Sequence, residues 1–217
     1  MTTRRTGLRE QKKQATREAL RAAALRLALE RGPDNVRVDD IAEAAGVSPR
    51  TYNNYFSSRE QAIVAAVAGE REARVAAAVI DRPDGVGLAD AVVEAVVDQY
   101  TASDAPGQEA LLLITTRPAL RDAFIDTTTA IERPLTEAIA QRLGDDDPHT
   151  ARVLAASVTA AVRVAIEQWL RTTVSSFTAG GLVVPSGSLP DLLRATLAPL
   201  TPALDAAEQR ALRHRHR

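Results

Sequence analysis

Apolar residues recur along this chain at spacings of three and four, the period of one face of an α-helix. Stretches rich in glycine and proline at residues 81–87, 103–107, 144–148 and 179–190 interrupt the pattern. The nearest approach to a strand signal is the β-branched pair within residues 181–185, and the neighbouring glycines and proline favour a loop there. The sequence therefore predicts an all-α fold. The expected helices cover residues 10–31, 38–45, 49–55, 59–80, 88–101, 108–117, 119–143, 150–177 and 191–213.

Three prolines fall inside two of these expected helices. Proline has no amide hydrogen and its ring collides with the preceding turn, so it interrupts the hydrogen bonds of a helix. We expect Pro134 to bend or break the helix 119–143 near Arg133. Pro199 and Pro202 are expected to divide the last helix into fragments.

Two short helices joined by a tight turn are predicted at residues 38–56. Gly46 can adopt the left-handed conformation that ends the first helix. Ser48 suits the N-cap of the second helix, and Pro49 suits its first helical position. This is the pattern of a DNA-reading helix-turn-helix. The apolar stripe of the first helix consists of Val38, Ile41, Ala42 and Ala45.

The second of these helices begins with polar side chains, and the first turns of a recognition helix face the major groove of DNA. Arg50, Asn53 and Asn54 are the candidates for base reading. Arginine pairs with guanine, and asparagine with adenine, through two hydrogen bonds each. The alternative interpretation is that these three side chains are only exposed to solvent.

Further residues of the same region are candidates for contacts with the DNA backbone. Thr51 is expected to contact a phosphate or a thymine methyl group, and the Tyr55 hydroxyl is expected to contact a phosphate. Tyr52 and Phe56 are instead expected to pack in the core. Side chains at helix beginnings can bind phosphate together with free backbone amides. The candidates of that kind are Arg37, Ser48 and Arg59.

Residues 9–75 resemble the DNA-binding part of the tetracycline-repressor (TetR) family of bacterial transcriptional regulators. The shared pattern begins with a long first helix and a second helix that ends in the sequence AGVS. The third helix ends in an aromatic pair, and the fourth helix opens with a polar and a basic residue, here Ser58 and Arg59. Arg37 stands where the family often has a capping threonine; it cannot cap, but it can pair with phosphate. Asn53 stands where the family often has an aromatic residue, so it either adds a base contact or removes a phosphate contact.

The resemblance implies three parts: an amino-terminal arm and helix-turn-helix domain at residues 1–58, a connecting helix at 59–80, and a helical ligand-binding and dimerisation domain at 81–217. In the family the last two helices pair with those of a second subunit. Here residues 150–177 and 191–213 are apolar on more than one face, which favours such burial. The expected protein is a homodimeric repressor of a pseudopalindromic operator. The alternative is a helix-turn-helix that binds another protein, without sequence-specific DNA binding.

The resemblance also implies a cavity for a small-molecule effector among the middle helices. The three aromatic candidates for lining it are more often core residues at helical spacing. The two charged candidates lie at i and i+4, where they can simply pair with each other. The expected effector is an uncharged or amphipathic organic molecule. The five candidates are Tyr100, Phe124, Arg163, Glu167 and Trp169.

Charge is distributed unevenly between the two ends of the chain. The 217 residues have a net charge of −1, yet residues 1–31 contain nine arginines and lysines against three glutamates, a net charge of +6. A basic part on an otherwise acidic protein is typical of phosphate attraction. Residues 1–8 are either a solvated, disordered tail or a flexible arm that places Arg4 and Arg5 in a minor groove.

Composition narrows the function classes further. The absence of cysteine excludes disulfides, thiolate metal sites and cysteine nucleophiles, and no metal or other cofactor is expected. No run of consecutive apolar residues approaches 18, and no apolar signal core follows the basic start, so we expect a cytoplasmic protein. No catalytic constellation or glycine-rich phosphate loop is recognisable, so an enzyme is not expected.

Overall fold

The computed structural model describes residues 2–68, 71–83, 85–101, 108–144, 148–178 and 188–215. Within these ranges the regular elements are α- and 3-10 helices, without a strand, which confirms the predicted all-α class. The chain folds as two compact units. The reading unit comprises Met1–Gly69 and Pro106–Phe124, and the bundle unit comprises Glu70–Ala105 and Ile125–Arg217.

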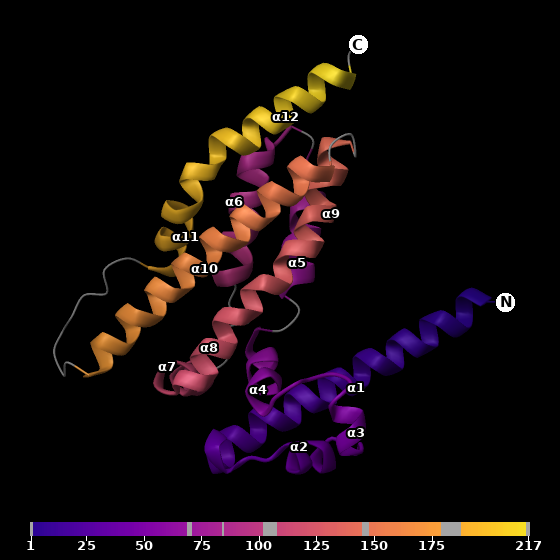
Figure 1. Cartoon of the computed structure of the whole chain (residues 1–217), viewed down its shortest axis with the longest axis vertical. Coiled ribbons are helices and arrows are strands. Elements are labelled where there is room, and N and C mark those ends of the chain that lie inside the picture. The colour runs from indigo at the N-terminus through magenta and orange to yellow at the C-terminus, as the bar shows by residue number, and fades with distance from the viewer. Residues whose placement is uncertain are drawn as a thin grey trace. The chain divides into compact units, whose positions relative to one another are not determined.

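The reading unit is built around the long first helix (Figure 1). Its core forms where α1 packs against α2 and α4, through fully buried side chains such as Leu20, Ile41 and Ile63. Helix α7, from the middle of the sequence, packs against α1 and α4 of the same unit. The elements are α1 (Thr2–Arg31), η1 (Pro33–Asn35), α2 (Val38–Ala44), α3 (Pro49–Tyr52), α4 (Arg59–Ala68), α7 (Gln108–Thr116) and α8 (Pro118–Asp126), whose last two residues belong to the bundle unit.

Two serine side chains and Gln61 cap the beginning of α4. The Ser58 hydroxyl accepts a hydrogen bond from the Gln61 amide at 3.1 Å. The Gln61 side chain, however, reaches back to Ser57, accepting its amide at 2.7 Å and its hydroxyl at 3.0 Å. The helix expected at 59–80 is described as α4 and α5 (Arg71–Asp81), on either side of residues 69–70, which lie outside the described residues.

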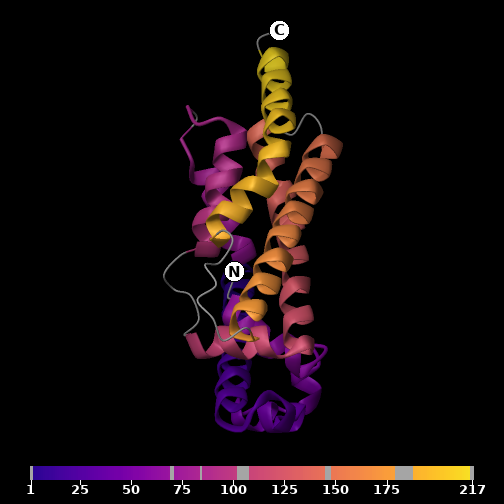
Figure 2. The same ribbon diagram turned by 90° about the vertical axis from the view of Figure 1, so that its left-hand side faces the viewer.

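The bundle unit is an assembly of roughly aligned helices around the long helix α10 (Figures 1 and 2). Helix α10 runs beside α9 and also packs against α11, while α5 packs against α6 and α9. The remaining elements of this unit are α6 (Leu88–Thr101), η2 (Thr127–Ile131), α9 (Glu132–Leu143), α10 (Pro148–Thr178), α11 (Leu189–Leu197), η3 (Ala198–Leu200) and α12 (Thr201–Arg215).

Both expected effects of proline are confirmed. The helix expected at 119–143 is divided into α8, η2 and α9, and Pro134 lies in the first turn of α9, where its missing amide hydrogen costs no helical bond. The last helix is divided into α11, η3 and α12, with Pro199 inside η3 and Pro202 in the first turn of α12.

Two charged side chains fix the connection between α5 and α6. The Arg142 guanidinium, from α9, donates to the carbonyl oxygens of Val79 at 3.3 Å, Arg82 at 3.0 Å and Val86 at 2.6 Å. The Glu208 carboxylate, from α12, accepts the Leu88 amide at 3.0 Å and so satisfies a free donor at the beginning of α6.

Within the described chain, one segment is apolar and long enough to cross a membrane by composition. It is Pro148–Arg171 in α10, with a mean hydropathy of 1.3. Half of it is buried inside the unit, as expected for the core helix of a folded bundle. The other half includes the exposed residues Val153 and Val164.

Candidate nucleic-acid interface

The turn between α2 and α3 has the geometry predicted from its glycine and serine. Gly46 adopts a φ of 69°, the left-handed region, and the Val47 amide donates to the Ala42 carbonyl at 2.9 Å. The Ser48 hydroxyl accepts the Thr51 amide at 3.1 Å, which confirms Ser48 as the N-cap of α3. The relative direction of α2 and α3 is thereby fixed by local hydrogen bonds.

The third helix is shorter than the predicted 49–55, because regular α-helix ends at Tyr52. Hydrogen bonds from the Asn53 amide to the Pro49 carbonyl and from the Phe56 amide to the Tyr52 carbonyl, both 3.1 Å, still hold the following turn. Residues 49–56, called the reading segment below, therefore form one ordered stretch.

The reading segment divides its side chains between solvent and core. Arg50, Asn53 and Asn54 are exposed, so the three predicted base-reading side chains are all accessible on one short segment. Thr51 and Tyr55 are half-buried, and the Thr51 hydroxyl shares a 2.9 Å hydrogen bond with that of Ser48. Each hydroxyl has a single hydrogen, so whichever one accepts in this pair keeps its own hydrogen for donation to a phosphate oxygen.

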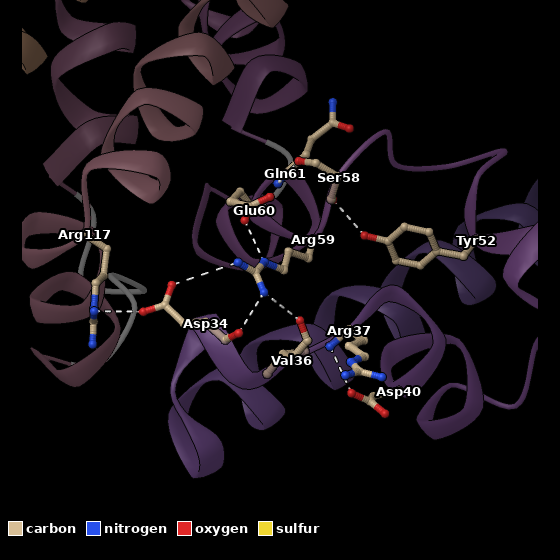
Figure 3. Close-up of polar contacts among 10 residues, drawn as sticks. All are labelled: Asp34, Val36, Arg37, Asp40, Tyr52, Ser58, Arg59, Glu60, Gln61 and Arg117. Carbon is tan, nitrogen blue, oxygen red and sulfur yellow. Dashed lines mark hydrogen bonds and ion pairs between the residues drawn. The ribbon is translucent and has the colours of Figure 1, made fainter.

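Two aromatic side chains anchor the reading segment in the core. Tyr52 is fully buried and Phe56 is 2% exposed, as predicted, with ring centroids 5.9 Å apart. The Tyr52 hydroxyl donates to the Ser58 carbonyl at 2.7 Å and so ties the segment to the start of α4 (Figure 3). The guanidinium of Arg17, from α1, lies 5.8 Å from the centre of the Phe56 ring.

The burial of Tyr52 makes the stability of the reading unit sensitive to alkali. Burial, together with the nearby charge of Glu60, raises the pKa of the Tyr52 hydroxyl to about 12 from its ordinary value of 10.0. The unfolded chain ionises first, so the stability contribution is complete below pH 10 and is lost as the pH rises towards 12. Two pKa units correspond to about 2.7 kcal/mol. Denaturant unfolding at pH 9 and at pH 11.5 should show a lower free energy of unfolding at the higher pH. The difference between the two pH values should be smaller for the Tyr52→Phe variant.

Arg59 lies at the centre of a polar cluster at the beginning of α4 (Figure 3). Its Nη1 donates to the carbonyl oxygens of Asp34 and Val36, each at 3.0 Å, and its Nε donates to the Glu60 carboxylate at 2.7 Å. Burial alone would raise the pKa of Glu60, but hydrogen bonds from Arg59, from its own backbone amide and from Ser58 together hold that pKa below its usual value. These contacts tie α4 to the segment before α2.

The geometry gives Arg59 a role within the protein that differs from the predicted phosphate contact, which stays a prediction. Replacement of Arg59 by alanine should lower the free energy of unfolding by about 2–3 kcal/mol, since it leaves two carbonyl groups and a carboxylate without their charged donor. Urea denaturation followed by circular dichroism measures this. Arg37→Ala is the matched control, because the Arg37 side chain is exposed; an equal loss in both variants would contradict the role of Arg59.

Arg37 occupies the N-cap position of α2 without a capping bond from its side chain. Its backbone amide instead donates to the Asp40 carboxylate at 2.9 Å, so the helix start is closed by Asp40 (Figure 3). The Arg37 guanidinium is exposed next to the helix beginning, as a phosphate contact requires.

Sequence reasoning missed three charged residues of the reading unit. Asp34 accepts a hydrogen bond from Arg117 at 2.9 Å and lies 3.9 Å from Nη2 of Arg59 (Figure 3). Arg17 packs on Phe56 through its guanidinium. The partners of Asp34 lie 25 and 83 residues away in sequence, so no local pattern indicates the cluster.

The five effector candidates are divided between the two units. Arg163 and Glu167 form the i, i+4 pair at 2.9 Å that was the simpler interpretation, and the Arg71 guanidinium lies 4.3 Å from the centre of the Tyr100 ring. Phe124 is buried in the reading unit, whereas Tyr100 and Trp169 are half-buried in the bundle unit. Their predicted role in effector binding stays a prediction.

A groove of about 390 Å³ lies between the beginning of α10 and α12. None of the five effector candidates lines it. Among the described residues there is also no group of three or more histidine, cysteine, aspartate or glutamate side chains that could hold a metal ion. The groove is lined by His149, Thr150, Val153, Leu154, Ala203, Ala206 and Arg210.

Comparison with known proteins identifies the family. Residues 20–66 match the family described as "Bacterial regulatory proteins, tetR family", and residues 86–205 match the "MftR C-terminal domain". The chain is also 30% identical over 174 residues to the HTH-type transcriptional regulator TcmR of Streptomyces glaucescens, across 75% of this chain and 76% of that protein. The chain belongs to the TetR family. It is accordingly a TetR-family transcriptional regulator, and residues 38–56 are its helix-turn-helix.

A solved structure from Rhodococcus sp., described as a TetR-family transcriptional regulator, is similar over 88% of this chain and 99% of that chain. The sequence identity is 22% and the TM-score is 0.46. In this TetR-family regulator the first family match spans the end of α1 through most of α4, and the second spans α6 through the beginning of α12.

Proposed function

We propose that this TetR-family regulator binds a pseudopalindromic operator as a homodimer and represses transcription there until a small organic molecule releases it. The observation that carries the proposal is the joint exposure of Arg50, Asn53 and Asn54 on the reading segment. Their hydrogen-bonding groups are free to face base edges, while Tyr52 and Phe56 hold the backbone beneath them.

The proposed dimer uses an apolar stripe on α10. Val153 and Val164 are 64% and 50% exposed, and Ser157 and Ala160 lie between them at the spacing of one helical face. The Ser157 hydroxyl donates to the Val153 carbonyl at 2.8 Å, which satisfies its polar group within the helix. A face of small and apolar side chains lets two helices approach closely, and a twofold dimer would bury the same stripe from both copies. We call residues 153, 157, 160 and 164 the α10 stripe.

The proposal also covers the division of the chain, its location and its effector. We propose residues 1–58 as the DNA-reading part, 59–80 as the connection, and 81–217 as the part that binds the effector and forms the dimer, in a cytoplasmic protein. For the effector to release DNA, it must bind the released conformation more tightly than the DNA-bound one. The proposed effector is uncharged or amphipathic.

The experiment that tests the proposal is selection of bound duplexes from a random-sequence DNA pool by the purified full-length protein. The most strongly enriched duplex is then titrated with the protein at two salt concentrations, in parallel with a scrambled duplex of the same length. We expect a pseudopalindrome that binds at least about 1,000-fold more tightly than the scrambled duplex. No enrichment, with only weak binding, would overturn operator reading and favour the protein-interaction alternative.

Substitutions on the reading segment separate base contacts from phosphate contacts. Asn54→Ala should cost about 1–3 kcal/mol of operator affinity and should relax the preference at one base position of each half-site. Tyr55→Phe, its neighbour and matched control, should weaken binding to operator and scrambled DNA by the same factor, because a contact with phosphate carries no sequence information. Titration of both variants against single-base operator variants measures this. Uniform weakening by Asn54→Ala would reassign Asn54 to phosphate.

A further inference from the structure

Helix α1 carries a row of basic residues at successive intervals of four. Arg9 and Lys13 are exposed, Arg17 is half-buried, and Arg21 is buried and pairs with Glu18 at 3.5 Å. We call these four residues the basic stripe. The stripe begins inside the reading unit at Arg21 and continues outwards along α1 towards solvent.

The side of α1 that bears the stripe is fixed by Arg17. Its guanidinium lies over the ring of Phe56, the last residue of the reading segment. Its buried Nε atom has no hydrogen-bond partner among the described residues. Each step of four residues turns a helix by about 40°, so Lys13 and Arg9 lie within about 80° of the direction of Arg17. The exposed end of the stripe therefore continues the side of α1 that meets the reading segment.

The outer part of α1 extends beyond the rest of the reading unit (Figure 1). The side chains of residues 9 and 11–15 are all exposed. Residues 2–16 form about 22 Å of helix at 1.5 Å per residue, a length comparable to about six base pairs of duplex. The sequence left residues 1–8 as either a disordered tail or a flexible arm, whereas the backbone is helical from Thr2; the side chains of Arg4 and Arg5 lie outside the described residues.

The charge pattern of this segment suits an anionic partner better than water alone. From Arg9 to Arg17 the sequence has four basic residues against one acidic residue, Glu10, and the like charges of Arg9 and Lys13 at i and i+4 oppose each other. Lys12 adds a further exposed cation beside the stripe. Evenly spaced phosphates would neutralise these charges, and release of the condensed counterions would favour the contact.

We propose that the outer basic stripe, Arg9 and Lys13 together with Lys12, is a second DNA-binding surface that follows the phosphates flanking each operator half-site. This inference rests on the proposed operator binding. The contact is with the backbone and not with base edges, so it raises affinity without adding sequence preference. It also lengthens the stretch of DNA that each protomer covers.

The test compares the full-length protein with a variant carrying Arg9→Gln, Lys12→Gln and Lys13→Gln, because glutamine removes charge and keeps helix propensity. The matched control carries Arg74→Gln, Arg133→Gln and Arg194→Gln, the same change in net charge at exposed positions of the bundle unit. Each protein is titrated with the selected operator, once trimmed to the half-sites and once with seven additional base pairs on each side, over a range of salt concentrations.

We expect wild type and control to bind the flanked duplex about tenfold more tightly than the trimmed one, and the stripe variant to bind both alike. The dependence of log affinity on log salt should become shallower by about 0.9 for each phosphate that the variant no longer neutralises. An unchanged flank preference and salt slope in the stripe variant, with normal operator selection by wild type, would overturn this inference alone. Failure of wild type to prefer any sequence would instead overturn the proposed function.

Discussion

Replacement of Val164 by arginine should convert the proposed dimer into monomers and weaken operator binding by about 100-fold or more. Val164 is half exposed at the carboxyl-terminal end of the α10 stripe, and in a twofold dimer each copy of the new charge would face the partner's stripe without a counterion. Loss of the dimer removes the second reading segment, and bivalent binding contributes about 100- to 10,000-fold to affinity. Analytical ultracentrifugation and operator titration measure the two effects.

Ile80→Arg provides the matched control for this experiment, because Ile80 is a 39% exposed aliphatic residue at the end of α5. It introduces the same charge into the bundle unit away from the α10 stripe. We expect this variant to remain dimeric and to bind the operator normally. A Val164→Arg protein that stays dimeric would show that the interface lies elsewhere. A monomeric wild-type protein would overturn the homodimer itself.

Replacement of Tyr52 by alanine should destabilise the reading unit by about 3–5 kcal/mol. Tyr52 is fully buried, its ring packs against Phe56, and its hydroxyl is the donor to the Ser58 carbonyl. The substitution opens a cavity beneath the reading segment and leaves that carbonyl without its donor. Because total stability is commonly about 5–15 kcal/mol, much of the protein population should lose an ordered reading unit at moderate urea concentrations.

Two controls make the Tyr52 result interpretable. Tyr52→Phe keeps the ring and removes only the hydrogen bond, so we expect a cost of about 1 kcal/mol. Tyr55→Ala removes a neighbouring half-buried ring and should cost less stability than Tyr52→Ala while still weakening DNA binding. Hydrogen exchange measured by mass spectrometry localises the change: protection should fall in α1 to α4 and persist in α9 and α10. Equal losses for Tyr52→Ala and Tyr52→Phe would contradict an anchoring role for the ring.

Local signals in the sequence predicted much of this fold. Gly46, Ser48 and Pro49 define the turn and the start of α3 because cap and turn geometry depends on residues within a few positions of one another. Pro134 marked the region of a helix break for the same reason. The expected burial of Tyr52 and Phe56 in the core is also confirmed.

Interactions between distant residues could not be predicted from the sequence. The phosphate contact expected of Arg59 stays a prediction, but its bonds to the carbonyl groups of Asp34 and Val36 were not foreseen, because backbone acceptors carry no signature in a sequence. The same holds for Arg142, which binds three carbonyl groups more than fifty residues earlier in the chain. The effector candidates were chosen by size and charge along helices, and neither property determines which side chains meet.

The reading unit is assembled from two separate stretches of sequence. This arrangement affects how segments can be exchanged between related regulators to make hybrid proteins. Helix α7 and most of α8 fold with α1 and α4, although 36 residues of the bundle unit, Glu70–Ala105, lie between them in the chain. A hybrid that takes its first 69 residues from one parent and the remainder from another would join α1 and α4 to a foreign α7. Exchange of operator specificity between relatives should therefore transplant residues 106–124 together with the amino-terminal segment, or change only the exposed side chains of residues 50–54.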